Sequence, residues 1–290
     1  MLIRTLDSAS IASGIVNEDR CGTSNCLAWV IDGATDVGTD PVTGAASDAS
    51  WFADEVHRAL VEQPGGLDLH ADPGLDLAEL PARLADHTSA AFAAVRRREP
   101  EDRFEYPSAS GVVVRASATE IQFVSVGDCT LILAQAGAVT RLGADLRDAG
   151  DQRLAAAIAN FQKTEVDPSA ESARRHVWPA IKAQRNKLNT PSGYGVLSIV
   201  PPPPAFVRTG RVEAAPGARL LLASDGLMRL VDVYRVMTVQ ALVEAAQTKG
   251  LAALCNELRR IEAADSRNFT YPRAKTSDDA TGLLLETGRS

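Results

Sequence analysis

The sequence has neither a long apolar run nor a surplus of basic residues. No stretch approaches the 18 consecutive apolar residues that suggest a membrane-spanning helix. The N-terminal segment turns polar too early to resemble a signal peptide. Lys and Arg number 30 against 37 Asp and Glu, so no positive excess is left to neutralise nucleic-acid phosphates. We therefore expect a cytoplasmic protein whose partners include neither membrane nor nucleic acid. The sequence says nothing about oligomeric state.

Cysteine and histidine are also rare, with four residues of each in the 290-residue chain. Cys21 and Cys26 have no histidine pair near them, and the four histidines are scattered. Zinc sites and Cys–His nucleophilic centres both need such residues in pairs, so neither is expected. No G-x-G-x-x-G motif follows a predicted strand, which leaves a dinucleotide-binding fold without support.

What the sequence does contain is an alternation of short apolar runs with longer helical patterns. Runs rich in β-branched residues predict strands at 26–31, 111–115, 120–126, 130–135, 195–200, 219–224 and 282–286. Two of them, EIQFVSV and TLILAQ, flank Gly127-Asp128 so closely that we expect them to pair as a hairpin.

Helical patterns occur in pairs. The first helix is expected to start near Asp48, a good N-cap, and to stop at Pro64-Gly65-Gly66. A second is predicted at 77–98, and a later pair at 239–248 and 251–264. Paired helices beside two antiparallel strand groups favour a layered α+β sandwich over βαβ crossovers.

Between two strand groups, residues 142–190 form a polar insert. Its pattern predicts helices at 153–163 and 171–189, the second interrupted by Pro179. We expect this insert to be a helical flap on a single domain that spans residues 1–290.

Acidic residues recur where strands end. Asp32-Gly33, Gly127-Asp128 and Asp225-Gly226 each follow a strongly apolar run, Asp278-Asp279 precedes one, and Glu18-Asp19 stands shortly before another. A single Asp-Gly pair is most often just a turn. Recurrence after several buried strands instead favours a shared site, because strand ends hold side chains rigidly at the rim of a cleft.

Converging carboxylates would require cations. Two carboxylates about 4 Å apart repel by roughly 4 kcal/mol at an effective dielectric constant near 20. Oxygen ligands without His or Cys suit hard ions such as Mg²⁺ or Mn²⁺. Two such ions can activate a bridging water and stabilise phosphoryl oxygens. The pattern therefore indicates phosphoester hydrolysis.

Five segments also resemble, in order, the motifs of the type 2C metal-dependent protein phosphatases, the PPM family. They are NED at 17–19, AWVIDGATD at 28–36, VSVGDCTLIL at 124–133, LLLASDGLMRLV at 220–231 and SDDATGLLLE at 277–286. The match covers about residues 15 to 286. It implies a four-layer α-β-β-α sandwich with a flap, and removal of phosphate from phosphoserine and phosphothreonine in protein substrates.

The resemblance also implies a dinuclear Mg²⁺ or Mn²⁺ centre with a weak third ion. The implied ligands are Glu18, Asp19, Asp32, the Gly33 carbonyl, Asp128, Asp225 and Asp278. Asp32 would bridge both ions and, with Asp19, be catalytic. Asp225 and Asp278 would hold one ion, Glu18 and Asp19 the other, and Asp128 the weak third.

Three positions depart from the family pattern. Gly14 stands where the family carries a phosphate-binding arginine, so Arg20 becomes the candidate for that role. Ala34 replaces a frequent histidine, and Arg229 a frequent aspartate. These departures motivate an alternative, a catalytically weakened regulatory or binding module on the phosphatase scaffold. A hydrolase for small phosphoesters is a further alternative.

Overall fold

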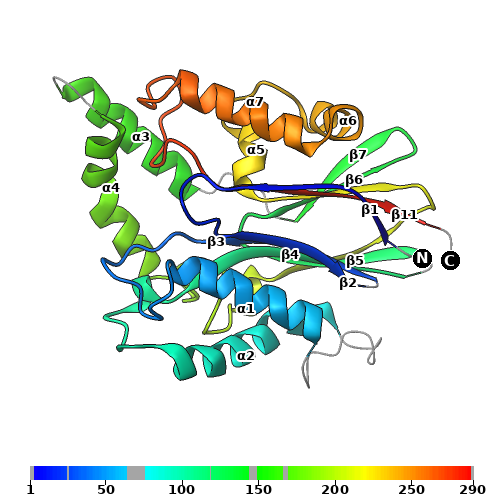
Figure 1. Ribbon diagram of the computed structural model, residues 1–290, viewed down its shortest axis with the longest axis horizontal. Coiled ribbons are helices and arrows are strands. Elements are labelled where there is room, and N and C mark those ends of the chain that lie inside the picture. Colours follow the sequence, from blue (N-terminus) through cyan, green and yellow to red (C-terminus); the bar gives the residue numbers. More distant parts are fainter. Residues whose placement is uncertain are drawn as a thin grey trace.

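The computed structural model describes residues 3–24, 26–63, 76–117, 119–143, 149–165 and 169–288. Two antiparallel β-sheets stack face to face, and helices cover both outer faces (Figure 1). This arrangement confirms the predicted α+β sandwich of four layers. Within the described residues, no helix is both long and apolar enough to cross a membrane.

The two sheets divide the strands as follows. The first sheet has the order β1 (Ile3–Ile11), β11 (Ala280–Thr287), β10 (Arg219–Ala223), β6 (Thr130–Gln135), β7 (Ala138–Gly143). The second has the order β2 (Asp19–Ser24), β3 (Leu27–Gly33), β4 (Ser108–Ala116), β5 (Glu120–Val126), β9 (Arg208–Glu213), with the short β8 (Leu197–Ser198) beside β4.

The helices form two outer layers and a separate pair. The second sheet is covered by α1 (Asp48–Glu62) and α2 (Leu80–Val95), and the first by α5 (Asp225–Asp232), α6 (Val239–Lys249) and α7 (Leu251–Ala264). The remaining pair, α3 (Ala149–Thr164) and α4 (Ala170–Arg185), lies at one end of the sandwich (Figure 1). Short 3-10 turns occur at Leu77–Glu79, Arg103–Glu105 and Pro204–Phe206.

Strand alternation decides which side chains face which layer. In β3, Trp29 and Ile31 pack in the core beneath α1, whereas Ala28 and Val30 pack against the other sheet. Side chains two residues apart share a face of a strand. Asp32 continues the series of Ala28 and Val30, so it belongs to the inter-sheet face at the end of the strand.

The predicted hairpin across Gly127 is wrong. β5 pairs with β4 and β9 in one sheet, whereas β6 pairs with β10 and β7 in the other, so no edge of either strand is left for the partner. The chain crosses between sheets at Gly127, which has φ +84°, and a Cβ there would lie 2.2 Å from Ser110 Oγ. Only glycine tolerates both conditions.

The helix predictions need two smaller corrections, and one of the predictions cannot be compared with the structure. Pro179 does not interrupt α4, because it is exposed and the backbone carbonyl that it leaves unpaired can bond water. Ser47, not Asp48, is the N-cap of α1, since its side chain accepts from the Ser50 N–H. The predicted stop at Pro64-Gly65-Gly66 lies outside the described residues.

Candidate active site

Five aspartates, each at or just beyond the end of a different strand, lie at the same end of the sandwich. Asp19 and Asp32 lie opposite each other in the β2–β3 register. Asp225 opens α5 directly after β10, and its N–H points to Asp32 Oδ2 at 3.4 Å. Asp128 follows β5, and Asp278 precedes β11. The site therefore draws on both sheets.

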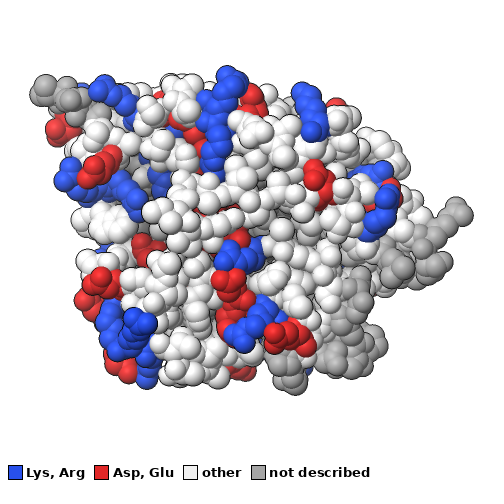
Figure 2. Space-filling view, in the orientation of Figure 1, with Lys and Arg blue, Asp and Glu red and all other residues white. Residues whose placement is uncertain are grey.

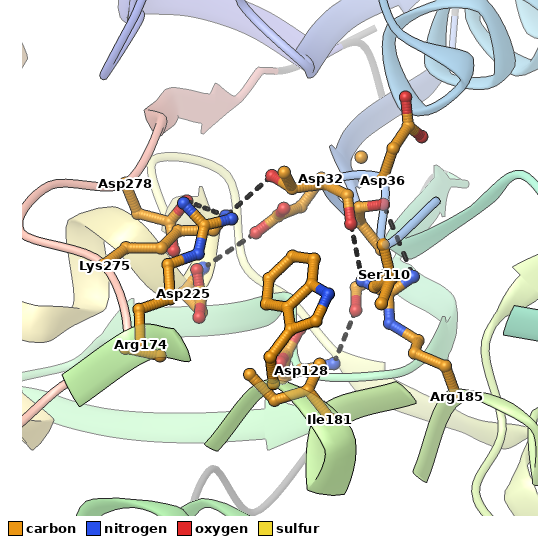
Figure 3. A pocket seen from close by; sticks show the side chains of 16 residues that line it. Asp32, Asp36, Ser110, Asp128, Arg174, Ile181, Arg185, Asp225, Lys275 and Asp278 are labelled. Carbon is orange, nitrogen blue, oxygen red and sulfur yellow. Dashed lines mark hydrogen bonds and ion pairs between the residues drawn. The ribbon is translucent and has the colours of Figure 1, made fainter. Parts of the chain in front are cut away.

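A cavity of about 190 Å³ opens above these residues (Figure 3). Its acidic lining residues are Asp32, Asp36, Asp128, Asp225 and Asp278, and its basic ones are Arg174, Arg185 and Lys275. Asp19 does not line the cavity; it is 2% exposed and lies behind the wall beside Asp32. The cavity thus combines a cluster of carboxylates with three cationic side chains.

Burial and mutual repulsion make these carboxylates hard to ionise. Burial raises the pKa of Asp19 to about 7, against the opposing effect of the nearby Thr281 and Ser224 hydroxyls. Burial, reinforced by Asp128 and Asp278, also raises the pKa of Asp225 to about 7. The pKa of Asp32 lies well above its ordinary value, through burial and then through Asp19. A nearby positive charge would reverse these shifts.

Asp19 provides the clearest test of whether a metal fits. Both of its carboxylate oxygens are buried without a hydrogen-bond partner, although the Thr281 and Ser224 hydroxyls are close enough to affect its pKa. Buried carboxylates in proteins are normally paired, hydrogen-bonded or metal-bound. An orphaned pair of hard oxygens beside Asp32 and Asp225 fits Mg²⁺ or Mn²⁺.

Asp278, by contrast, is already charge-paired. Lys275 Nζ lies 2.8 Å from its Oδ1, and Arg229 Nη2 lies 2.6 Å from its Oδ2. Although burial acts to raise it, Lys275 and Arg229 hold the pKa of Asp278 below its ordinary value. As the side chains stand, no group of three or more acidic, His or Cys residues in the described part of the chain converges on one ion position.

Glu18 and Gly33 have different surroundings from the aspartates. The Glu18 carboxylate accepts from the Thr35 and Ser47 hydroxyls and does not line the cavity. Gly33 does line it, and a Cβ at this position would lie 2.5 Å from the Glu18 carbonyl oxygen. The close approach of the two backbones explains why glycine stands there.

Asp36 fixes the loop that follows β3. Its carboxylate accepts the backbone N–H groups of Asp48 at 2.8 Å and Ala49 at 3.1 Å, at the start of α1. Burial raises its pKa to about 6. The floor of the cavity is thereby tied to the first turn of that helix.

The structure does not bring Arg20 to the cavity. Its guanidinium forms two hydrogen bonds with the Asp54 carboxylate, at 2.5 and 2.8 Å, and also donates to the carbonyl oxygens of Asn17 and Asp19. The cations that do line the cavity, Arg174 and Arg185 on α4 and Lys275 before β11, were missed in the sequence. The signal that could have found the arginines is their spacing on one helix face.

Comparison with known proteins gives the same fold. No protein-family model and no curated protein matches the sequence. Among solved structures, the Mycobacterium tuberculosis Ser/Thr phosphatase PstP/Ppp matches with 19% identity, coverage of 100% of both chains and a TM-score of 0.57. PppA, a regulatory component of T6SS in Pseudomonas aeruginosa, matches with 16% identity, coverage of 99% and 98%, and a TM-score of 0.53.

A third match bears on metals. The catalytic domain of PstP in complex with two manganese ions is 19% identical, with coverage of 98% of both chains and a TM-score of 0.51. At these sequence identities the comparisons establish the fold alone. The chemistry has to be inferred from the residues of the site.

Proposed function

Because the chain has the fold of type 2C (PPM) Ser/Thr phosphatases, we propose that it is a metal-dependent protein phosphatase acting on phosphoserine and phosphothreonine. The observation that carries the proposal is the unpartnered, buried carboxylate of Asp19 beside Asp32 at the cavity. The manganese ions of one structural neighbour support Mn²⁺ or Mg²⁺ as the cofactor.

In this proposal the aspartates hold the ions and position them on the cavity floor. Asp19, Asp32 and Asp225, with the Gly33 carbonyl, would be the main ligands. When bound, two divalent ions supply Lewis acidity and a water of lowered pKa for attack on phosphorus. Asp128, which also lines the cavity, would belong to the weaker third position.

Asp278 and Glu18 would join this set less directly. Asp278 would become a ligand only after the Lys275 ammonium moves away from Asp278 Oδ1. Lys275 therefore competes with the metal for this carboxylate. Glu18 would act through water, since its own oxygens accept from Thr35 and Ser47. Both roles follow from the contacts that the two side chains already make.

The test is hydrolysis of a phosphoserine peptide with Mn²⁺ and then with a chelator. We expect activity that requires metal and that falls about 100-fold or more in Asp32→Asn, the loss typical of removing a transition-state contact. Asp86→Asn on α2, an exposed carboxylate, is the matched control and should behave as wild type. Turnover that ignores both the chelator and Asp32→Asn would rule the proposal out.

The second candidate function is a binding or regulatory module with little turnover. The pairing of Asp278 with Lys275 and Arg229 favours it, because both oxygens of one expected ligand are engaged by cations. A pure protein that binds Mn²⁺ yet turns over no phosphopeptide would select this candidate. Robust phosphopeptide turnover would eliminate it.

A further inference from the structure

One face of α4 forms a wall of the cavity. The lining side chains on this helix are Arg174, Trp178, Ile181 and Arg185, at steps of four, three and four residues. Such steps return to the same face of an α-helix. We call these four residues the α4 stripe; it places two guanidinium groups opposite a cluster of carboxylates.

Arg185 carries a charge that no acidic side chain compensates directly. Its guanidinium donates to the carbonyl oxygens of Ala34 at 3.4 Å and Thr35 at 3.1 Å, and to Ser108 Oγ at 3.4 Å. All three acceptors are neutral, and within the described residues Arg185 forms no ion pair. The Arg185 guanidinium is therefore held at the cavity while no carboxylate neutralises its charge.

Arg174 is in a similar state. Its guanidinium carbon lies 4.9 Å from the centre of the Trp178 ring, and no ion pair with another described residue involves it. In Figure 3 its side chain extends toward the side of the cavity where Asp278 and Lys275 lie, whereas Arg185 lies on the opposite side. The two guanidinium groups thus approach the cavity from two directions.

Contacts beyond its C-terminal end and on its far face hold α4 in this position. Beyond its C-terminus, Asn186 Oδ1 accepts the Phe104 N–H at 2.9 Å. On its other face, Val177 packs with Ile158 of α3 in a small apolar core. Because the helix is held on two sides, its arginines have a set distance from the aspartates.

The other basic residues considered for phosphate binding already have acidic partners. Arg20 pairs with Asp54, away from the cavity. Both Lys275 and Arg229 pair with Asp278. A phosphate monoester that enters the cavity would meet carboxylates, with any ions that they hold, on one side and the α4 stripe on the other.

We propose that the α4 stripe is the substrate-recognition wall, with Arg174 and Arg185 binding the phosphate oxygens. A guanidinium presents a planar fork of donors that matches phosphate geometry. Trp178 and Ile181 provide an apolar surface for the chain on either side of the phosphorylated residue. The assignment rests on the proposed function for the reaction, but binding can be measured without turnover.

The probe is a fluorescein-labelled peptide that carries a non-hydrolysable phosphonate analogue of phosphoserine. Its binding to the full-length protein with Mn²⁺ is measured by fluorescence anisotropy, with the serine peptide as reference. Arg174→Gln and Arg185→Gln should each weaken binding about tenfold or more, since each removes charge-assisted hydrogen bonds. The matching lysine variants should restore part of the affinity.

The control is Arg175→Gln, on the outer face of the same helix, where Arg175 is exposed and approaches the exposed Glu171 at 4.0 Å. It should bind within about twofold of wild type, since it removes no contact with the cavity. Thermal unfolding of every variant checks folding. If Arg185→Gln is destabilised through its contacts with Ala34 and Thr35, Arg174→Gln decides alone, because within the described residues the Arg174 side chain stacks on Trp178 of the same helix and forms no ion pair.

The outcomes separate the two proposals. Loss of phosphonate affinity in the glutamine variants supports the α4 stripe, whether or not the wild type hydrolyses the phosphopeptide. A wild type that binds the phosphonate peptide but hydrolyses no phosphopeptide counts against the phosphatase reaction alone. Unchanged affinity and unchanged KM in both variants of an active enzyme overturn the α4 stripe and leave the phosphatase proposal intact.

Discussion

Asp19 and its acidic neighbours determine the behaviour of the site at the residue scale. The sequence predicted that carboxylates at strand ends would meet, and Asp19 and Asp225 do lie close enough to raise the pKa of Asp32, which burial raises first. This proximity could be predicted because Asp32 and Asp225 each stand beside an apolar run that reads as a buried strand. The pairing of Asp278 with Lys275 was missed although the two residues are only three positions apart. The pairing of Asp278 with Arg229 was not foreseeable, because it depends on how α5 packs beside the segment before β11.

Metal should stabilise the protein more at pH 8 than at pH 5.5. The folded-state pKa values of Asp19 and Asp225 are raised from 3.8 to about 7, so these groups stabilise the metal-free fold in acid and that contribution is lost as the pH rises through 7. Bound Mn²⁺ would offset the resulting repulsion, and below pH 7 it must displace protons.

Thermal unfolding with and without Mn²⁺ at the two pH values measures this difference. If Mn²⁺ raises the Tm equally at pH 5.5 and pH 8, the carboxylates of raised pKa, Asp19 and Asp225, do not bind the ion.

Removing Lys275 should strengthen metal binding. Its ammonium lies 2.8 Å from Asp278 Oδ1 and repels a cation at the same carboxylate. Lys275→Met is expected to lower the Kd for Mn²⁺ roughly tenfold, measured by isothermal titration calorimetry. Lys249→Met, an exposed lysine at the end of α6, serves as control. A weaker affinity in Lys275→Met would mean that Lys275 supports the site instead of competing for it.

At the scale of elements, apolar content decided what could be predicted. Glu120–Val126, Thr130–Gln135 and Leu251–Ala264 have the bounds that their patterns indicated. β9 and β1 were missed because they are largely polar; β9, for example, reads RTGRVE and alternates between exposed and half-buried positions. The failed hairpin shows the limit of local reasoning, since two adjacent strands joined different sheets.

The passage from β10 into α5 should tolerate no side chain at Gly226. A Cβ there would lie 1.8 Å from the Asp279 carbonyl oxygen, so Gly226→Ala must push α5 away from β11 and displace Asp225. We expect a loss of about 3 kcal/mol or more in the free energy of unfolding, the upper range for overpacking. Chemical denaturation gives the value.

Gly14→Ala is the matched control for this substitution, because nothing lies within 4 Å of a Cβ at that position. It should leave stability nearly unchanged. Equal stabilities of the two variants would contradict the close packing of α5 on β11.

At the scale of the whole molecule, the site exists only while both sheets stay packed together. Asp19 and Asp32 come from one sheet, whereas Asp225 and Asp278 adjoin strands of the other. Their relative position depends on the inter-sheet core, which includes Leu222 of β10. The motif order predicted this fold, but the strand order within each sheet could not be read from the sequence.

Leu222→Ala should therefore destabilise the entire domain. The side chain is fully buried between the sheets, and such truncations cost about 2–5 kcal/mol. Circular dichroism and tryptophan fluorescence should report one shared transition at a lower Tm. Val61→Ala on the exposed face of α1 should change little. Two separated transitions in Leu222→Ala would show that the sheets unfold independently.

The surface charge bears on how the proposed phosphate substrate would be recognised. On the face that Figure 2 shows, basic and acidic side chains are interspersed among neutral ones. The net charge of the chain is −7. Under the proposed function, phosphate recognition would depend on a few placed cations and on metal, because the net negative charge is unfavourable to anions.

The most direct test of the metal centre is a crystal soaked in Mn²⁺ and measured at the manganese absorption edge. Anomalous peaks are predicted at Asp32, about 3.5–4 Å apart, with Asp19 and Asp225 among the ligands. A well-ordered site without any peak at these carboxylates, and with Lys275 still paired to Asp278, would contradict the account.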